Sequence, residues 1–244
     1  MDERGPTTNV IQFPAHRRGT LEDTLSGFPE RSGEGWFGTR AEREVTALHA
    51  EIRGWRTITD RVGPAQAEET LARVVSRILE TLSAMDAGSV TVGGEPLQPV
   101  IACTFEGDGH AYRALYAAVA IRGAAGKTQF PALPGHQYQV CMGVNSGAVV
   151  DARLATDGEG TIEFQSVGTV EMFAARLQEF AGPGQVFLSA DTAELAGELA
   201  ATRSIGDVRV NAAGERREAF ILTEIAAADA LPAHTPPAVA EPES

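Results

Sequence analysis

The feature that most constrains the fold is a repeated switch in the spacing of apolar residues along the middle of the chain. Residues 44–51 alternate apolar and polar side chains, which is typical of a strand with one buried face. After Gly63-Pro64, apolar residues recur every three to four positions up to Leu82, which predicts a helix with one buried face. Because such segments keep alternating, residues 43–225 are predicted to form one domain of mixed helices and strands.

The remaining segments give the order of elements βαββαββαβαββ. Two β-like runs, 89–92 and 100–105, flank a segment with Gly and Pro and predict a hairpin. A turn is predicted at 145–147 between two further strands. This order favours an α+β sandwich, a mostly antiparallel sheet with helices packed against it. The other predicted helices are 111–121, 169–180 and 189–199, and the other predicted strands are 138–144, 147–150, 185–188 and those around Val208 and Phe220.

Both ends of the chain differ in composition from the domain. Residues 1–42 interleave Gly, Pro, Ser, Thr and Arg with scattered apolar residues, which predicts a disordered N-terminal arm. Residues 226–244 are rich in Ala and Pro and predict a disordered tail. Apolar residues of the arm, such as Trp36 and Phe37, either bind a protein partner or pack on the flank of the domain.

Composition excludes several classes of protein. The 244 residues carry a formal net charge of −13, which argues against a nucleic-acid or anionic-membrane surface. No apolar run approaches the roughly 18 residues of a membrane span, and the first 30 residues lack a secretory signal. Cys103 and Cys141 each lie within an apolar run, which predicts reduced, buried thiols. We therefore expect a soluble, cytoplasmic protein.

Five segments occur in a specific order and spacing. They are Ala50-Glu51-Ile52-Arg53-Gly54-Trp55, residues 111–122, Met142-Gly143-Val144-Asn145-Ser146-Gly147-Ala148-Val149, residues 164–168 followed by 174–177, and Gly182-Pro183-Gly184-Gln185-Val186. Together they resemble the catalytic domain of class III nucleotide cyclases, the family of adenylate and guanylate cyclases. The resemblance covers nearly the whole predicted domain and implies the ferredoxin-like sandwich of that family.

The resemblance also implies a mechanism and an assembly. Family members form a head-to-tail dimer with active sites at the interface. Two aspartates of one subunit hold two divalent metal ions on the triphosphate, while an asparagine and an arginine of the other steer the ribose and stabilise the pentavalent phosphorus. The metals lower the barrier because they activate the attacking 3′ hydroxyl and neutralise the growing charge.

The metal-binding positions of the family are not matched. The first aspartate corresponds to Glu51, whose extra methylene moves the carboxylate by about an ångström. The alternative interpretation of Glu51 is a solvated carboxylate at the end of an edge-facing strand. The second aspartate falls on Pro99, which offers no ligand. Glu95, about four residues out of register, is the only carboxylate of this hairpin, and it substitutes only if the loop folds back.

The nucleotide-contacting positions are matched at one residue. The purine-selecting lysine has no counterpart, because Lys127 is the only lysine of the chain and follows the second matching segment. The second base-selecting position falls on Gln165. The catalytic asparagine falls on Met172, which cannot donate a hydrogen bond to ribose and is interpreted as a core residue. Only Arg176 matches, and a surface ion pair with Glu179 explains it equally well.

These departures favour a degenerate cyclase domain that is inactive, needs no cofactor and acts as a regulatory or protein-interaction module. It is expected to form a homodimer, or a heterodimer with another cyclase-like domain. One alternative is an active cyclase, alone or with a partner that supplies the metal aspartates, and this would need Mg²⁺ or Mn²⁺. The other is an allosteric sensor that binds a nucleotide or small ligand through Gln165 and Glu95.

Overall fold

The computed structural model describes residues 41–95, 98–127, 139–155, 161–166, 168–211 and 214–226. The predicted arm and tail, including Trp36 and Phe37, lie outside these ranges apart from their innermost residues, Ala41, Glu42 and Ala226.

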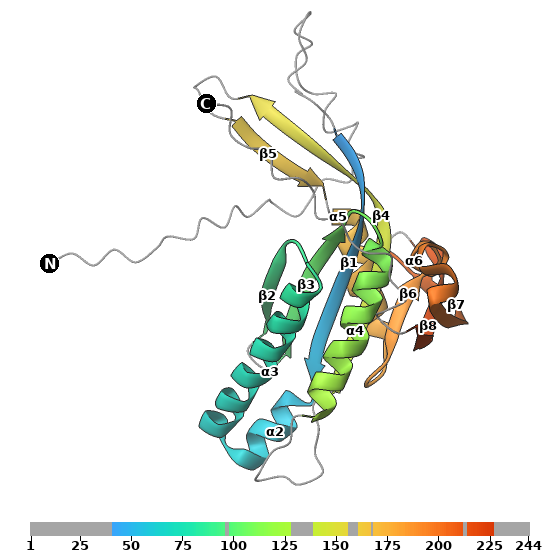
Figure 1. Ribbon diagram of the computed structural model, residues 1–244. Helices are drawn as coiled ribbons and strands as arrows, with labels where there is room; N and C mark the ends of the chain where they lie inside the picture. Colours follow the sequence, from blue (N-terminus) through green and yellow to red (C-terminus); the bar gives the residue numbers. More distant parts are fainter. Residues whose placement is uncertain are drawn as a thin grey trace, which may run out of the picture.

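The described strands form one sheet in the order β2-β3-β1-β4-β6-β8-β7, with β5 paired to an extension of β4 (Figure 1). Neighbouring strands run antiparallel except β4 and β6, which are parallel. The paired β4 and β5 project beyond the rest of the sheet as a two-stranded extension (Figure 1). The strands are β1 (Ala41–Arg53), β2 (Val90–Glu95), β3 (Gln98–Glu106), β4 (Gln139–Ala155), β5 (Thr161–Ser166), β6 (Val186–Ser189), β7 (Ala200–Arg209) and β8 (Arg216–Ile225).

Helices cover both faces of the sheet. The main core lies between one face and α2, α3, α4 and α6, whereas α5 packs alone on the other face, mainly on β4 and β1. The helices are α2 (Trp55–Val62), α3 (Pro64–Ala84), α4 (His110–Lys127), α5 (Gly168–Phe180) and α6 (Ala190–Ala196), followed by a 3₁₀ turn at Gly197–Leu199. This arrangement confirms the predicted α+β sandwich.

Strand β1 shows how the apolar alternation determines the two faces. Leu48 and Ile52 enter the main core, while Val45 and Ala47 join a smaller cluster with Val170 of α5. Successive side chains of a strand point to opposite faces, so β1 is buried on both sides. It lies between β3 and β4, and the prediction that it is an edge-facing strand is wrong.

The turn predicted at residues 145–147 is also wrong, because β4 continues straight through it. Asn145 donates from Nδ2 to the Val170 carbonyl at 2.9 Å, and Ser146 Oγ hydrogen-bonds Thr46 Oγ1 at 2.7 Å. At Gly147, a Cβ would lie 3.2 Å from Val170 Cγ2, so a glycine allows close packing here. These polar and small residues therefore serve contacts across the sheet rather than a change of direction.

The sequence pattern also missed helix α2. It begins after Gly54, which has φ of +82°, and buries only Trp55 and Ile58. Two buried positions in so short a helix give too little periodicity to detect. The predicted helix start at Pro64 and the hairpin of β2 and β3 are confirmed.

Candidate functional site

Glu51, the counterpart of the first metal aspartate, lies near the end of β1 on the face covered by α5. Its side chain is buried, with the residue 8% exposed, so the interpretation as a solvated carboxylate is wrong. Glu51 Oε2 accepts hydrogen bonds from Arg53 Nε at 2.8 Å and from Gln178 Nε2 of α5. Two donors of the chain itself therefore bind the same carboxylate oxygen.

Arg53 links this carboxylate to the end of α5. Its Nη1 donates to the Ala181 carbonyl at 3.0 Å, and its Nη2 donates to the carbonyls of Gln178 and Glu179 at 3.4 and 3.3 Å. A cation at a helix C-terminus is favourable because the last carbonyls have no partners within the helix. The positive charge facing Glu51 is thus supplied by a guanidinium group.

Neither of the strands that flank β1 pairs a carboxylate with Glu51. The register pairs Glu51 with Val100 of β3 and with Cys141 of β4, and directly paired residues share a face. Pro99, the counterpart of the second metal aspartate, is adjacent to Val100 and therefore lies on the opposite face, the one that Ile101 shares. Neither Val100 nor Pro99 offers an oxygen ligand from its side chain.

The remaining predicted ligand-binding residues are placed only by their backbone. Glu95 pairs with Gln98 at the end of the hairpin, and Gln165 of β5 pairs with Asp151 of β4. Their side chains lie outside the described part of the structure.

Helix α5 carries the counterparts of the catalytic asparagine and arginine. Met172 is 53% exposed, so its interpretation as a core residue is wrong, whereas the neighbouring Phe173 is 1% exposed. Arg176 Nη1 contacts Glu179 Oε2, three residues along the helix. This contact is the surface ion pair that the spacing predicts, with 36% of the Arg176 side chain exposed.

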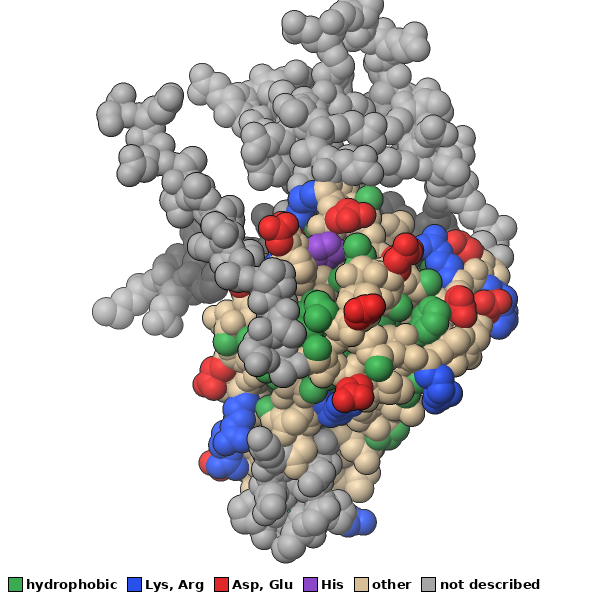
Figure 2. Space-filling view, turned by 45° about the vertical axis from the view of Figure 1, so that its right-hand side comes forward, with side chains coloured by type: hydrophobic (Ala, Val, Ile, Leu, Met, Phe, Trp, Pro, Cys, Tyr) green, Lys and Arg blue, Asp and Glu red, His purple; other side chains and the backbone are tan. Residues whose placement is uncertain are grey.

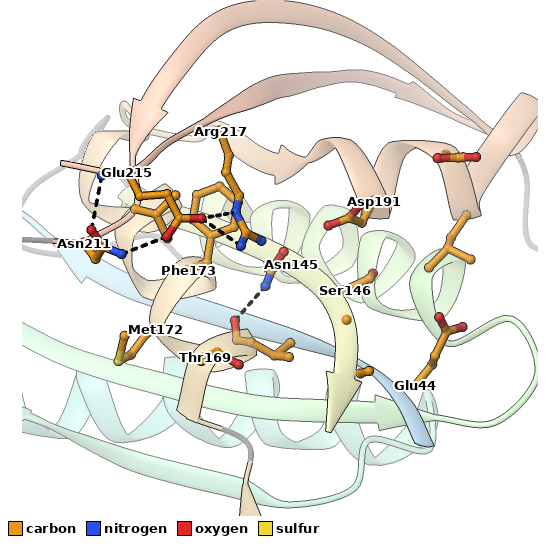
Figure 3. A pocket seen from close by; sticks show the side chains of 16 residues that line it. Glu44, Asn145, Ser146, Thr169, Met172, Phe173, Asp191, Asn211, Glu215 and Arg217 are labelled. Atoms are coloured by element: carbon orange, nitrogen blue, oxygen red, sulfur yellow. Dashed lines mark hydrogen bonds and ion pairs between the residues drawn. The ribbon is translucent and has the colours of Figure 1, made fainter. Parts of the chain in front are cut away.

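A groove with a volume of about 690 Å³ adjoins Met172 between α5, α6 and the turn from β7 to β8 (Figure 3). We call it the α5–α6 groove. Its apolar lining includes Val170, Met172, Phe173, Leu195 and Val210, and its acidic lining consists of Glu44, Asp191, Glu194 and Glu215.

The charges of this groove are unbalanced. Arg217, its only basic lining residue among those described, pairs with Glu215 at 2.9 Å and lies 5.8 Å from the centre of the Phe173 ring. Figure 2, in which the side with β6, β7 and β8 comes forward, shows acidic side chains over this face with hydrophobic ones exposed between them. In Figure 3, Asn145 lies among the groove residues, and its buried Oδ1 has no hydrogen-bond partner among the described residues.

Comparison with known proteins identifies the family to which this fold belongs. A model of the adenylate and guanylate cyclase catalytic domain matches residues 39–224. The chain belongs to this family. No curated protein gives a significant match to this chain.

Solved cyclase domains share the fold at low sequence identity. The guanylate cyclase domain of RhGC from Catenaria anguillulae, solved in complex with GTP, is 18% identical, with a TM-score of 0.58 over 76% of this chain and 99% of that one. The adenylyl cyclase CyaB from P. aeruginosa is 14% identical, with a TM-score of 0.58 over 77% and 97%. A non-canonical dimeric guanylyl cyclase domain from Blastocladiella emersonii is 17% identical, with a TM-score of 0.59 over 76% and 98%. The family match confirms the predicted resemblance, and these structures confirm the predicted fold.

The metal ions of the family do not fit the residues present. Within the described ranges, no three His, Cys, Asp or Glu side chains come together as a metal-binding group. Divalent magnesium requires several hard oxygen ligands. Glu51 binds Arg53 and Gln178 instead, and the residues paired with it, Val100 and Cys141, add no oxygen ligand.

His49 lies on the same face of β1 and gives a pH-dependent prediction. Its Nε2 is buried without a hydrogen-bond partner among the described residues, and burial lowers the pKa of His49 below the ordinary value of 6.5. Because folding favours the neutral ring, this contribution to stability is complete above pH 6.5 and is lost as pH falls toward the lowered pKa. We expect urea unfolding between pH 8 and 5 to show a loss of up to about 1.4 kcal/mol per pH unit from this residue. The His49→Gln variant should lose stability less steeply, and parallel curves would contradict the assignment.

Sequence reasoning missed the two features that define this region. Arg53 lies within the first matching segment, but its contacts depend on where α5 ends in space. The groove combines residues from β1, β4, α5, α6 and the β7–β8 turn, and no local pattern relates them.

None of the helices in the described ranges combines the length and apolar character needed to cross a bilayer.

Proposed function

We propose that this cyclase-family domain does not make cyclic nucleotide and acts by binding a protein partner. The observation that carries the proposal is the Glu51 carboxylate, which is buried and bound by Arg53 and Gln178. The residues paired with it are Val100 of β3 and Cys141 of β4. Cyclisation needs metal ions to activate the 3′ hydroxyl, and these residues leave no carboxylate pair to hold them.

The surface of α5 supports the same proposal, because it carries the counterparts of the residues that contact ribose and phosphate in the family. Met172 replaces a hydrogen-bond donor with a thioether, which is at most a weak acceptor. Arg176 is paired with Glu179. What the surface offers is exposed apolar area beside the α5–α6 groove, and exposed apolar patches commonly mark binding sites.

An assay of product formation tests the proposal directly. The full chain is incubated with ATP, GTP, CTP or UTP and with Mg²⁺ or Mn²⁺, and products are measured by mass spectrometry beside an active class III cyclase. We expect no cyclic nucleotide above the protein-free blank, from either the natural chain or the Arg176→Ala variant. Product that disappears in Arg176→Ala would overturn the proposal.

A second arm tests heterodimer formation. A cyclase domain with the complete set of family motifs is assayed with and without the chain. A gain of product that requires Arg176 would show that the chain completes an active site in a partner. A thermal-shift series with the four nucleotides tests ligand sensing, because a ligand at a hundred times its Kd stabilises by about 2.7 kcal/mol.

The proposal includes a dimeric, cytoplasmic protein with a regulatory role in signalling. The dimer is supported by the family resemblance; the Blastocladiella domain of the same fold was solved both as a non-canonical dimer and as a monomer. The cytoplasm is supported by Cys103 and Cys141, which are both buried and unpaired, as expected of thiols in a reducing compartment.

Glu51 gives a stability test of the same interpretation. We expect Glu51→Gln to lower the free energy of unfolding by about 1.5–3 kcal/mol, because hydrogen bonds to charged groups contribute about that much. Urea denaturation without added metal measures the loss. The matched control is Glu69→Gln, which removes an exposed ion pair with Arg73 at 3.5 Å. This substitution should lower the free energy of unfolding by at most about 0.5 kcal/mol. A neutral or stabilising Glu51→Gln would instead indicate a strained carboxylate of the kind that a metal site contains.

A further inference from the structure

We infer that the α5–α6 groove binds a segment of the chain's own N-terminal arm, residues 9–18. This inference concerns what fills the groove in the free chain, and a protein partner that binds the proposed α5 surface would have to displace the arm. It does not depend on whether the domain turns over nucleotide. It rests on the apolar surface, the charge and the position of the groove.

The groove presents apolar area that no described residue covers. Met172 of α5 and Leu195 of α6 are 53% and 48% exposed, and both line it. Behind them lie the buried side chains of Phe173 and Val170. An occupant with two or three large apolar side chains would therefore remove hydrophobic area from water on both sides.

The acidic side of the groove selects the charge of the occupant. Glu215 is paired with Arg217, but no Lys or Arg within the described ranges forms an ion pair with Glu44, Asp191 or Glu194. Glu44 of β1 and Asp191 of α6 lie on the side of the groove opposite Met172 and Phe173 (Figure 3), and Glu194 of α6 also lines the groove. Complementary potentials favour a partner that carries positive charge next to its apolar side chains.

The N-terminal arm contains such a segment. Residues 9–18 read Asn-Val-Ile-Gln-Phe-Pro-Ala-His-Arg-Arg, with Val10, Ile11 and Phe13 followed by Arg17 and Arg18. The segment has no acidic residue. By contrast, the apolar pair Trp36 and Phe37 follows Glu34 and lacks an adjacent pair of cations.

The groove lies close to the point where the arm joins the domain. The described chain begins at Ala41 in β1, and Glu44 of the same strand lines the groove. Residues 19–40 can span up to about 70 Å when extended, which is ample to bring residues 9–18 back to this site. Because the segment is tethered, its effective concentration at the groove reaches the millimolar range, so weak contacts suffice.

Disulfide trapping in the full chain tests the inference. Ala15→Cys places a thiol within the segment without removing its apolar side chains, and Thr169→Cys places one in the groove lining. The natural thiols do not compete, because Cys103 and Cys141 are buried, and burial raises the pKa of Cys103 to about 12. The control pair joins Ala15→Cys to Ser76→Cys, an exposed position on α3 across the sheet. We expect the groove pair to oxidise within one chain about tenfold faster than the control pair.

Charge exchange identifies the contacts. Arg17→Glu with Arg18→Glu should slow trapping about tenfold, and Asp191→Arg with Glu194→Arg on exposed positions of α6 should restore it. Ile11→Ser with Phe13→Ser should slow trapping similarly, whereas Leu25→Ser with Phe28→Ser should leave it unchanged. Thermal melting of each variant checks that the domain is folded.

The alternatives give different results. Equal rates for the groove and control pairs would overturn the inference. Trapping only between two chains, seen as a covalent dimer on a non-reducing gel, would assign the groove to a second copy. A trapping rate that neither the charge variants nor the apolar variants change would show that tethering alone brings the thiols together.

Discussion

Gly143→Ala is expected to destabilise the domain by about 3 kcal/mol or more, and to displace α5 from the sheet. A Cβ at position 143 would lie 2.0 Å from the Ala174 carbonyl oxygen, 2.4 Å from the Gln178 backbone nitrogen and 2.9 Å from Leu177 Cβ. Two of these atoms belong to the helix backbone, so no side-chain rotation relieves the contact. Overpacking of a core typically costs about 1–3 kcal/mol, and a clash with backbone exceeds that range.

The matched control for this prediction is Gly93→Ala. Gly93 also lies in a strand, β2, but a Cβ there would meet nothing within 4 Å, and its φ is not in the left-handed region. Its substitution should change the free energy of unfolding by less than about 0.5 kcal/mol. Urea denaturation of both variants measures the difference, and equal effects would mean that α5 does not lie directly on β4.

The same close approach explains why Gly143 stands in one of the sequence motifs. Gly143 pairs with His49 on β1, two positions before Glu51. Lifting α5 at this point would move Gln178 away from the Glu51 carboxylate that it binds. The glycine therefore positions the α5 face as well as packing it.

The outline of the fold could be predicted because it depends on local patterns. The apolar alternation of β1 and the period of α3 arise from neighbouring residues, and each predicted the correct element. The course of β4 could not be predicted this way. Asn145 and Ser146 are typical turn residues, and only the packing of Val170 and Thr46 against them shows that they belong to a strand.

The candidate site shows the same limit more strongly. Spacing located Glu51 and Met172 correctly in their elements, but not their surroundings. Glu51 is buried because β1 is central and because Gln178 lies above it, which are both properties of the assembled sheet. Met172 is exposed because α5 packs alone on its face and directs Phe173 inward instead.

The second large effect is expected on substitution of Arg113, which connects α4 to the ends of α3 and β3. This arginine of α4 is 5% exposed. Its Nη1 donates to the carbonyls of Met85 and Asp86 at 3.3 and 3.2 Å, and its Nη2 donates to the Glu106 carbonyl at the end of β3. Its guanidinium also lies 6.0 Å from the centre of the Phe105 ring. One side chain thus satisfies the carbonyls at the ends of α3 and β3.

Arg113→Met keeps most of the apolar stem but removes every donor, so the three part-buried hydrogen bonds to the carbonyls of Met85, Asp86 and Glu106 are lost. We expect a loss of about 3 kcal/mol in the free energy of unfolding, since a hydrogen bond donated by a charged group contributes about 1.5–3 kcal/mol. The control is Arg73→Met on α3, whose side chain is 57% exposed and should contribute at most about 0.5 kcal/mol. Arg113 holds the turn after α3 through the carbonyls of Met85 and Asp86, and Asp86 has a φ of +55°. Hydrogen exchange of the amides in this turn should therefore rise with Arg113→Met, while the amides at the centre of α3 stay protected. If the two arginine variants unfold alike, water replaces the guanidinium at these carbonyls, and α4 is held to α3 by apolar packing alone.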